Sequence, residues 1–106
     1  MANKRIHLCG FLIAGPVVHS HAVWRNPKQE TPFLSLEHYV SIARTLDRGM
    51  FDLLFFADRL AIADRYGSSH EMGIRLGDQD ATRMDPVPIL GAMAAVTKHI
   101  GLGATR

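Results

Sequence analysis

The stretch Phe51-Asp52-Leu53-Leu54-Phe55-Phe56-Ala57-Asp58 decides the fold. It is mostly apolar, it is too short for an ordinary helix, and it follows Asp47-Arg48-Gly49, a combination typical of a helix end. Apolar residues at consecutive positions put apolar side chains on both faces of a strand. The pattern therefore predicts a strand covered on both sides, as in the centre of a parallel sheet of an α/β protein.

Asp58 closes this strand with a charged side chain. In α/β proteins ligands bind beyond the carboxyl ends of parallel strands, so this position favours a binding site with Asp58 at its mouth. Aspartate is also common where a loop simply begins, because its side chain bonds to the nearby backbone. The strand alone leaves both interpretations open.

A strand and a helix are predicted ahead of this stretch. The apolar run Ile6–Ile13 has the length of a strand, and a Gly-Pro pair follows it. A helix capped by Ser35 extends to about Arg48, because apolar residues recur there at steps of three and four up to Met50. The same periodicity places Asp47 on the solvent side of this helix.

A second helix and a third strand are predicted after it. Asp85 followed by proline is typical of a helix start. The helix is expected to continue to Gly101, with Lys98 and His99 in its last turn, where the helix dipole favours cations. The third strand is Leu102–Thr105, so the predicted order is strand, helix, strand, helix, strand.

The connections between these elements are unequal in length. The strand-to-helix excursions, about 14–34 and 58–84, are long, whereas the helix-to-strand turns are short. Both excursions therefore leave from the carboxyl ends of parallel strands, which is the functional side of a β/α barrel or an open α/β sheet. An eight-stranded (β/α)8 barrel needs about 250 residues. We expect residues 1–106 to be a single partial domain, an N-terminal fragment that covers the β-α-β-α-β portion of an incomplete TIM barrel.

The composition excludes several classes of partner. The formal net charge is +2 and the basic residues are scattered, which argues against nucleic-acid binding. No apolar run approaches the roughly 20 residues of a membrane span. The single cysteine, Cys9, suits a reducing compartment and hence the cytoplasm. The basic pair Lys4-Arg5 ahead of an apolar run has the outline of a signal peptide, although glycine and proline interrupt that run.

Two functions that need no organic cofactor remain as alternatives. The pair His19 and His21 follows the first predicted strand and has the residue type of a zinc ligand, which would make the protein a metal-dependent hydrolase. A site of that kind needs three or four ligands, and the sequence presents no second cluster. The other alternative is a non-catalytic fragment that self-associates through its open sheet edges and exposed helix faces.

Three segments in order along the chain carry a family resemblance: 21–27 (HAVWRNP), 51–58 (FDLLFFAD) and 94–102 (AAVTKHIGL). Together they resemble the N-terminal part of the bacterial luciferase-like flavin-dependent monooxygenases. The branch is the one that contains nitrilotriacetate, dibenzothiophene-sulfone and long-chain alkane monooxygenases. The resemblance spans nearly the whole chain.

The resemblance implies a two-component enzyme. A separate NAD(P)H-dependent flavin reductase would supply reduced FMN, and the enzyme would use O₂ to oxidise a small organic substrate. It also implies a TIM-barrel fold. These are properties of the family, and the composition and periodicity of this chain do not establish them. We expect a homo-oligomer for another reason, because open strand edges and apolar helix stripes favour self-association.

The resemblance also assigns roles to five residues. Asp58 matches an acid on the second strand that contacts the flavin, Ala57 brings its backbone close to the flavin ring, and Thr105 matches a hydroxyl position on the third strand that also contacts the flavin. His21 and Tyr66 match positions that line the substrate pocket, and they are the candidate catalytic residues. From the residues alone, Tyr66 is equally an apolar anchor of its loop and Thr105 an ordinary β-branched strand residue.

Overall fold

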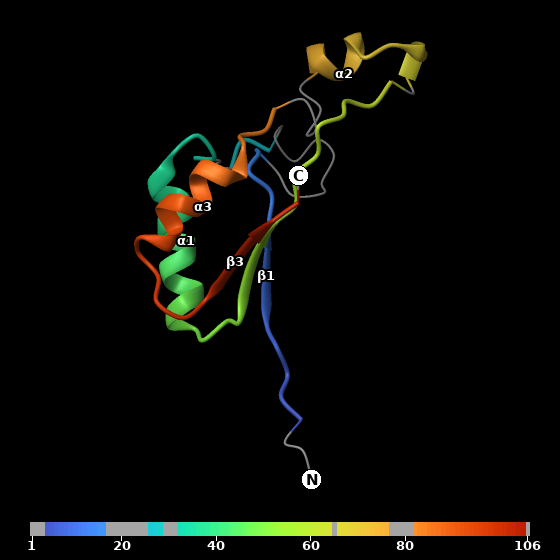
Figure 1. Ribbon diagram of the computed structural model, residues 1–106. Coiled ribbons are helices and arrows are strands. Elements are labelled where there is room, and N and C mark those ends of the chain that lie inside the picture. The colour runs from blue at the N-terminus through green and yellow to red at the C-terminus, as the bar shows by residue number, and fades with distance from the viewer. Residues whose placement is uncertain (1–3, 17–25, 29–31, 65, 77–81, 106) are drawn as a thin grey trace.

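A three-stranded parallel sheet forms the centre of the molecule (Figure 1). The computed structural model describes residues 4–16, 26–28, 32–64, 66–76 and 82–105. The strands β1 (Cys9–Leu12), β2 (Leu53–Phe56) and β3 (Gly101–Ala104) stand side by side in chain order. Their carboxyl ends therefore lie at one edge of the sheet, as predicted from the unequal excursions.

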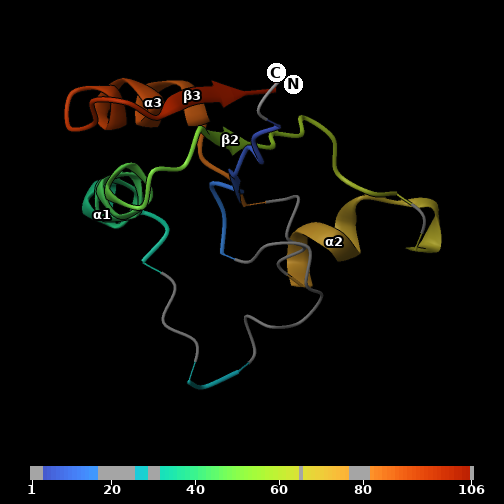
Figure 2. The ribbon, with the colours of Figure 1, turned by 90° about the horizontal axis from the view of Figure 1, so that it is seen from below.

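Two helices cover one face of this sheet. Helix α1 (Leu36–Arg48) connects β1 to β2, helix α3 (Pro86–Ala94) lies between β2 and β3, and both are on the same side (Figures 1 and 2). Right-handed crossovers between strands in chain order put successive helices on the same face. A β/α barrel is built in this way, whereas a doubly wound sheet carries helices on both faces. The predicted β-α-β-α-β portion of a TIM barrel is confirmed.

The core lies between the sheet and these helices. Leu54 and Phe56 of β2 point toward the helices and are fully buried, and the ring of Tyr39 on α1 lies 5.9 Å from that of Phe56. At Gly10 an added Cβ would stand 2.6 Å from Cδ1 of Leu46, so α1 packs closely onto β1 where this glycine leaves room. The buried core residues are all apolar or aromatic: Ala14, Tyr39, Ala43, Leu54, Phe56, Ile89, Met93 and Ile100.

The other face of the sheet corrects the first prediction. Phe11 and Leu53 point away from the helices and are 44% and 36% exposed, and the ring of Phe55 lies 6.2 Å from that of Phe11 in a tilted arrangement. Within the described residues β2 is therefore covered on one side only. The sequence pattern was correct in assigning apolar side chains to both faces, but it does not show which segment covers them.

The ends of α1 differ from the prediction in detail. Ser35 occupies the N-cap position, but its side chain makes no capping hydrogen bond. Gly49 is the C-cap residue with an ordinary negative φ, and the left-handed conformation falls on Met50, with φ 58°. Met50 is 72% exposed and is not part of the apolar stripe. The chain turns directly into β2 after this residue.

Helix α3 is shorter than predicted because the residues expected in its last turn instead bind the end of α1. It begins as expected, with Asp85 at the N-cap accepting a hydrogen bond from the Val87 N–H, but it ends at Ala94 rather than at Gly101. Lys98 and His99 are not in its last turn. Their N–H groups donate to the Asp47 carboxylate, as the next section of chain wraps around the end of α1.

Asp47 therefore holds the α3–β3 turn and does not face solvent freely. Its carboxylate accepts N–H groups from Lys98 at 3.1 Å, His99 at 2.9 Å and Ile100 at 2.9 Å, and its side chain is only 14% exposed. The hydrogen bonds from His99 and Ile100 lower the pKa of this carboxyl group because they stabilise its charged form. The prediction of a solvent-facing Asp47 was wrong.

The second excursion contains short helices that the sequence did not predict. A 3-10 helix, η2 (Tyr66–Ser68), and helix α2 (Glu71–Leu76) extend away from the sheet beyond the carboxyl end of β2 (Figure 1). An ion pair of 2.9 Å between Arg75 and Glu71, four residues apart, supports α2. Among the helices of the described residues, none is long and apolar enough to cross a membrane.

Candidate functional site

Three of the predicted site residues meet where β2 and β3 end. The register pairs Phe56 with Ala104, so Ala57 and Thr105 stand opposite each other one residue further on. The Ala57 N–H donates to the Leu12 carbonyl at 2.9 Å, and the Thr105 N–H donates to the Phe56 carbonyl at 3.0 Å. The backbone pairing of all three strands therefore continues to this edge, and Asp58 follows directly.

Asp58 and Thr105 contact each other. The Asp58 N–H donates to the Thr105 hydroxyl at 2.9 Å, and the hydroxyl lies 3.4 Å from the Asp58 carbonyl. The carboxylate of Asp58 accepts the N–H of Arg59 through Oδ1 at 2.8 Å. These bonds tie the exit of β2 to the exit of β3 and fix the direction in which the Asp58 side chain leaves the sheet.

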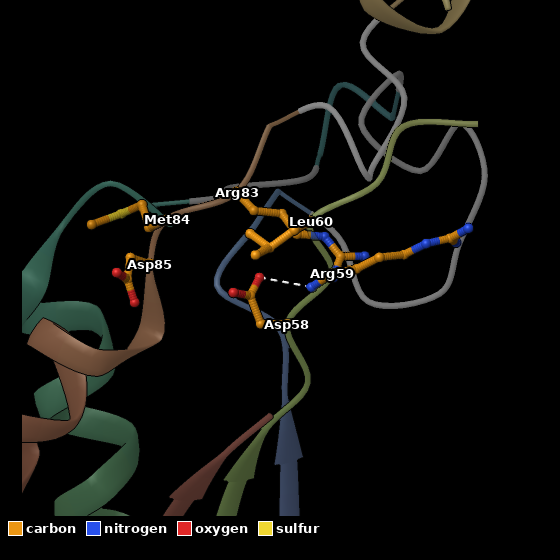
Figure 3. A pocket seen from close by; sticks show the side chains of 6 residues that line it. All are labelled: Asp58, Arg59, Leu60, Arg83, Met84 and Asp85. Carbon is orange, nitrogen blue, oxygen red and sulfur yellow. Dashed lines mark hydrogen bonds between the residues drawn. The ribbon is translucent and has the colours of Figure 1, made fainter. Parts of the chain in front are cut away.

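A pocket of about 200 Å³ opens beside Asp58 (Figure 3). One side comes from the exit of β2 and the other from the segment that leads into α3. Figure 3 shows the Asp58 carboxylate directed into the space between these two segments. The lining combines two acidic, two basic and two apolar side chains: Asp58, Arg59, Leu60, Arg83, Met84 and Asp85.

The far side of the pocket is held in place by backbone bonds. The Met84 N–H donates to the Ala14 carbonyl at 2.7 Å, which attaches the end of the second excursion to the exit of β1. An added Cβ on Gly15 would lie 3.1 Å from the Thr82 carbonyl oxygen, so the two segments are close along their length. Asp85 is fixed by its role as the N-cap of α3. The pocket is therefore lined by the exit of β2 and the start of α3, and the latter is attached to the exit of β1.

Comparison with known proteins finds relatives in sequence and in structure. No protein-family model matches the chain. A dibenzothiophene-sulfone monooxygenase of Rhodococcus erythropolis (strain XP) is 49% identical over 103 residues, which are 97% of this chain and 23% of that enzyme. The crystal structure of a long-chain alkane monooxygenase superposes with a TM-score of 0.84 at 32% identity and covers 98% of this chain and 24% of that structure.

The chain is similar to the N-terminal part of the luciferase-like monooxygenases. It spans about a quarter of the length of the relatives it matches, at the N-terminal end of their TIM barrels. A crystal structure of riboflavin lyase with modified FMN and riboflavin as substrate also matches, with a TM-score of 0.81 and 27% identity over 97% of this chain. The predicted family and branch are confirmed.

The remaining residues predicted from the luciferase-like monooxygenases are dispersed or lie outside the described part. The backbone of Tyr66 belongs to η2, in the outlying part of the second excursion. His21 lies outside the described residues, as does His19, so the proposed histidine pair stays a prediction. Among the residues that are described, no group of three or more His, Cys, Asp and Glu side chains has the arrangement of a metal site.

Sequence reasoning missed the pocket residues Arg83 and Met84. Both lie immediately ahead of Asp85, which the sequence identifies as the start of the second helix. In a luciferase-like monooxygenase barrel, a helix that follows a parallel strand by a crossover starts at the carboxyl edge of the sheet. The residues just before such an N-cap therefore lie at the functional edge, and this signal was available in the sequence.

Proposed function

We propose that this chain forms the first three strands and two helices of a cytoplasmic, FMN-dependent two-component monooxygenase. In this proposal residues 1–106 are a single partial domain of the barrel. A separate NAD(P)H-dependent flavin reductase supplies reduced FMN, and a small organic substrate is oxidised with O₂. The complete enzyme is a homo-oligomer.

The observation that carries the proposal is the position of the Asp58 carboxylate, which lines a pocket at the edge where three parallel strands end. Asp58 lies at the carboxyl edge of a parallel sheet, beside a pocket, in a chain that is 49% identical to a monooxygenase over 103 residues. In TIM-barrel enzymes the active site is built at this edge. The riboflavin lyase that matches this chain contains a modified FMN, which supports a flavin as the ligand.

The residues at this edge fit part of a flavin. Ala57 is small and half-buried, so its backbone allows close approach, and the Asp58 carboxylate offers an acceptor for ring N–H groups. Leu60 and Met84 supply apolar surface beside that carboxylate. Ligand pockets usually measure about 300–1,000 Å³, so the 200 Å³ here forms only part of a complete site.

Each residue has a defined part in the proposal. Asp58 accepts hydrogen bonds from the flavin, Ala57 lies under the ring, and Thr105 contributes its hydroxyl at the end of β3. His21 and Tyr66 line the substrate side. Reduced FMN, when bound, supplies the electrons that activate O₂ for transfer to the substrate. The protein orients the flavin and the substrate and keeps water away from the reacting atoms.

A flavin titration tests this proposal, and β2 offers a matched control. Asp58 follows the carboxyl end of β2, and Asp52 precedes its amino end. We expect FMN to quench or shift its fluorescence on binding to the chain, and Asp58→Asn to weaken binding about 10-fold or more, because hydrogen bonds to charged groups contribute about 1.5–3 kcal/mol. Asp52→Asn should leave the affinity within about twofold. Equal losses in both variants would contradict the assignment of Asp58.

The open face of the sheet supports self-association as a second property of the 106-residue chain. Phe11 and Leu53 are partly exposed there, and β1 and β3 each have an edge without a partner strand among the described residues. Exposed apolar surface and unpaired strand edges both favour association. Association through this face would cover it and is compatible with flavin binding at the strand exits.

A further inference from the structure

Thr105 interrupts the backbone ladder between β2 and β3. In a parallel ladder the residue pairs Leu53–Gly101 and Phe55–Gly103 lead to the pair Ala57–Thr105. The next bond in this pattern would run from the Asp58 N–H to the backbone carbonyl of Thr105. The structure instead has the Asp58 N–H donating to the Thr105 hydroxyl at 2.9 Å. The side chain thus replaces the backbone as the last acceptor of the ladder.

The hydroxyl is occupied on both sides by the same residue. A threonine hydroxyl has one donor and two acceptor positions. One acceptor position receives the Asp58 N–H, and the donor faces the Asp58 carbonyl at 3.4 Å. One acceptor position is left for any ligand. The backbone of Asp58 therefore uses two of the three hydrogen-bonding positions of the Thr105 hydroxyl.

The carboxylate of Asp58 is held by a second bond in the same place. Its Oδ1 accepts the Arg59 N–H at 2.8 Å, so both the backbone and the side chain of Asp58 are restrained. Within the described part of the chain, Oδ2 makes no hydrogen bond, and Figure 3 shows the carboxylate directed into the pocket. The restraint leaves one carboxylate oxygen presented to a ligand.

We propose that Thr105 is a positioning residue, whose hydroxyl holds the exit of β2 so that Asp58 presents its carboxylate to the pocket. The expected effect on flavin binding rests on the proposed function, whereas the contact between the Thr105 hydroxyl and the Asp58 backbone does not. The family resemblance implies that Thr105 contacts the flavin itself, whereas in this proposal Thr105 affects the flavin only through Asp58. Substitution by valine removes the hydroxyl and keeps the branched shape, and substitution by serine keeps the hydroxyl.

Amide hydrogen exchange of the 106-residue chain, measured by NMR, tests the contact without any ligand. We expect Thr105→Val to speed exchange of the Asp58 amide about five- to tenfold, as expected for loss of one hydrogen bond. Thr105→Ser should stay within about twofold of the wild type. The Ala57 amide, which is bonded to Leu12 on β1, is the internal control and should not change. Equal exchange of the Asp58 amide in all three proteins would overturn the proposal.

FMN affinity in a double-mutant cycle tests the action through Asp58. If Thr105 acts through the carboxylate, Thr105→Val weakens FMN binding about three- to tenfold in the wild type and has no further effect in Asp58→Ala. Thr105→Ser should restore the affinity. Equal losses in both backgrounds would show direct contact with flavin and overturn the positioning role. Absence of FMN binding by the wild type would instead contradict the proposed function, while the exchange result still decides the contact.

Discussion

Tyr39→Phe removes one hydroxyl from the core and tests how the first excursion is attached. Tyr39 is 1% exposed, and its hydroxyl donates to the Phe33 carbonyl at 2.6 Å. Phe33 lies where the excursion after β1 returns to α1. The bond therefore attaches the end of this excursion to the helix that packs on the sheet.

The expected loss of stability is about 1 kcal/mol. A hydrogen bond between neutral groups contributes about 0.5–1.5 kcal/mol net, and a carbonyl left without a partner in a buried place costs more. Phe33 is only half-buried, so water can reach its carbonyl in the variant and the larger penalty does not apply. Phenylalanine fills the same volume and leaves no cavity. For a domain of this size about 1 kcal/mol corresponds to a decrease in Tm of about 4–8 °C.

The difference between the two proteins should depend on pH. Burial raises the pKa of Tyr39 above its ordinary value near 10, because the ionised form is poorly solvated in the core. The stabilising contribution is complete below about pH 10 and is lost as the pH rises toward the higher pKa of the folded state. Tyr39→Phe has no such titration, so the two stability curves should converge in alkaline solution.

Urea unfolding followed by circular dichroism between pH 7 and 11 measures both effects. Thr45→Val is the matched control, because it also removes one hydroxyl, but from a solvent-exposed bond within α1 to the Ser41 carbonyl. Its stability should stay within about 0.5 kcal/mol of the wild type. Equal stability of Tyr39→Phe and wild type at pH 7, or a difference that grows above pH 10, would refute this reasoning.

Two further predictions concern the amino edge and the open face. Asp47→Asn should destabilise the protein at pH 7, because an amide nitrogen would face the Lys98 N–H. The lowered pKa of Asp47 makes its stabilising contribution complete above about pH 3.9, and further acidification removes it. The unfolding midpoints of variant and wild type should therefore converge at low pH, and a constant separation would contradict the role. Replacing both Phe11 and Leu53 by serine should lower the sedimentation coefficient of a self-associating wild type toward that of a monomer, and unchanged association would place the contact elsewhere.

The order of strands and helices was predictable because each element has its own local pattern. The short apolar run at β2 and the N-cap signal Asp85 are properties of adjacent residues, and the structure confirms both. The end of α3 was not predictable in this way. The residues after Ala94 leave the helix because Asp47, about fifty positions earlier, accepts their N–H groups. Such a contact across the sequence has no local signal.

The candidate site was predictable to the same extent as its elements. The meeting of Asp58 with Thr105 follows from parallel strands in register, but the bond from the Asp58 N–H to the Thr105 hydroxyl departs from the regular ladder and was not predictable. The N-cap signal of Asp85 was enough to place Arg83 and Met84 at the functional edge, but not to show that they line a pocket. Their position depends on the bond from the Met84 N–H to the Ala14 carbonyl, which joins two loops that no periodicity connects.

The central proposal is that the exits of β2 and β3 form part of the flavin site of a monooxygenase. The direct measurement uses the dibenzothiophene-sulfone monooxygenase of Rhodococcus erythropolis, with its matched 103 residues replaced by this chain. Turnover of the sulfone is measured with O₂ and a flavin reductase. We predict that the chimaera is active, that Asp58→Asn lowers kcat/KM about 10- to 100-fold, and that Asp52→Asn leaves it within about twofold. A folded chimaera in which Asp58→Asn keeps full turnover, or in which Asp52→Asn causes the larger loss, would contradict the claim.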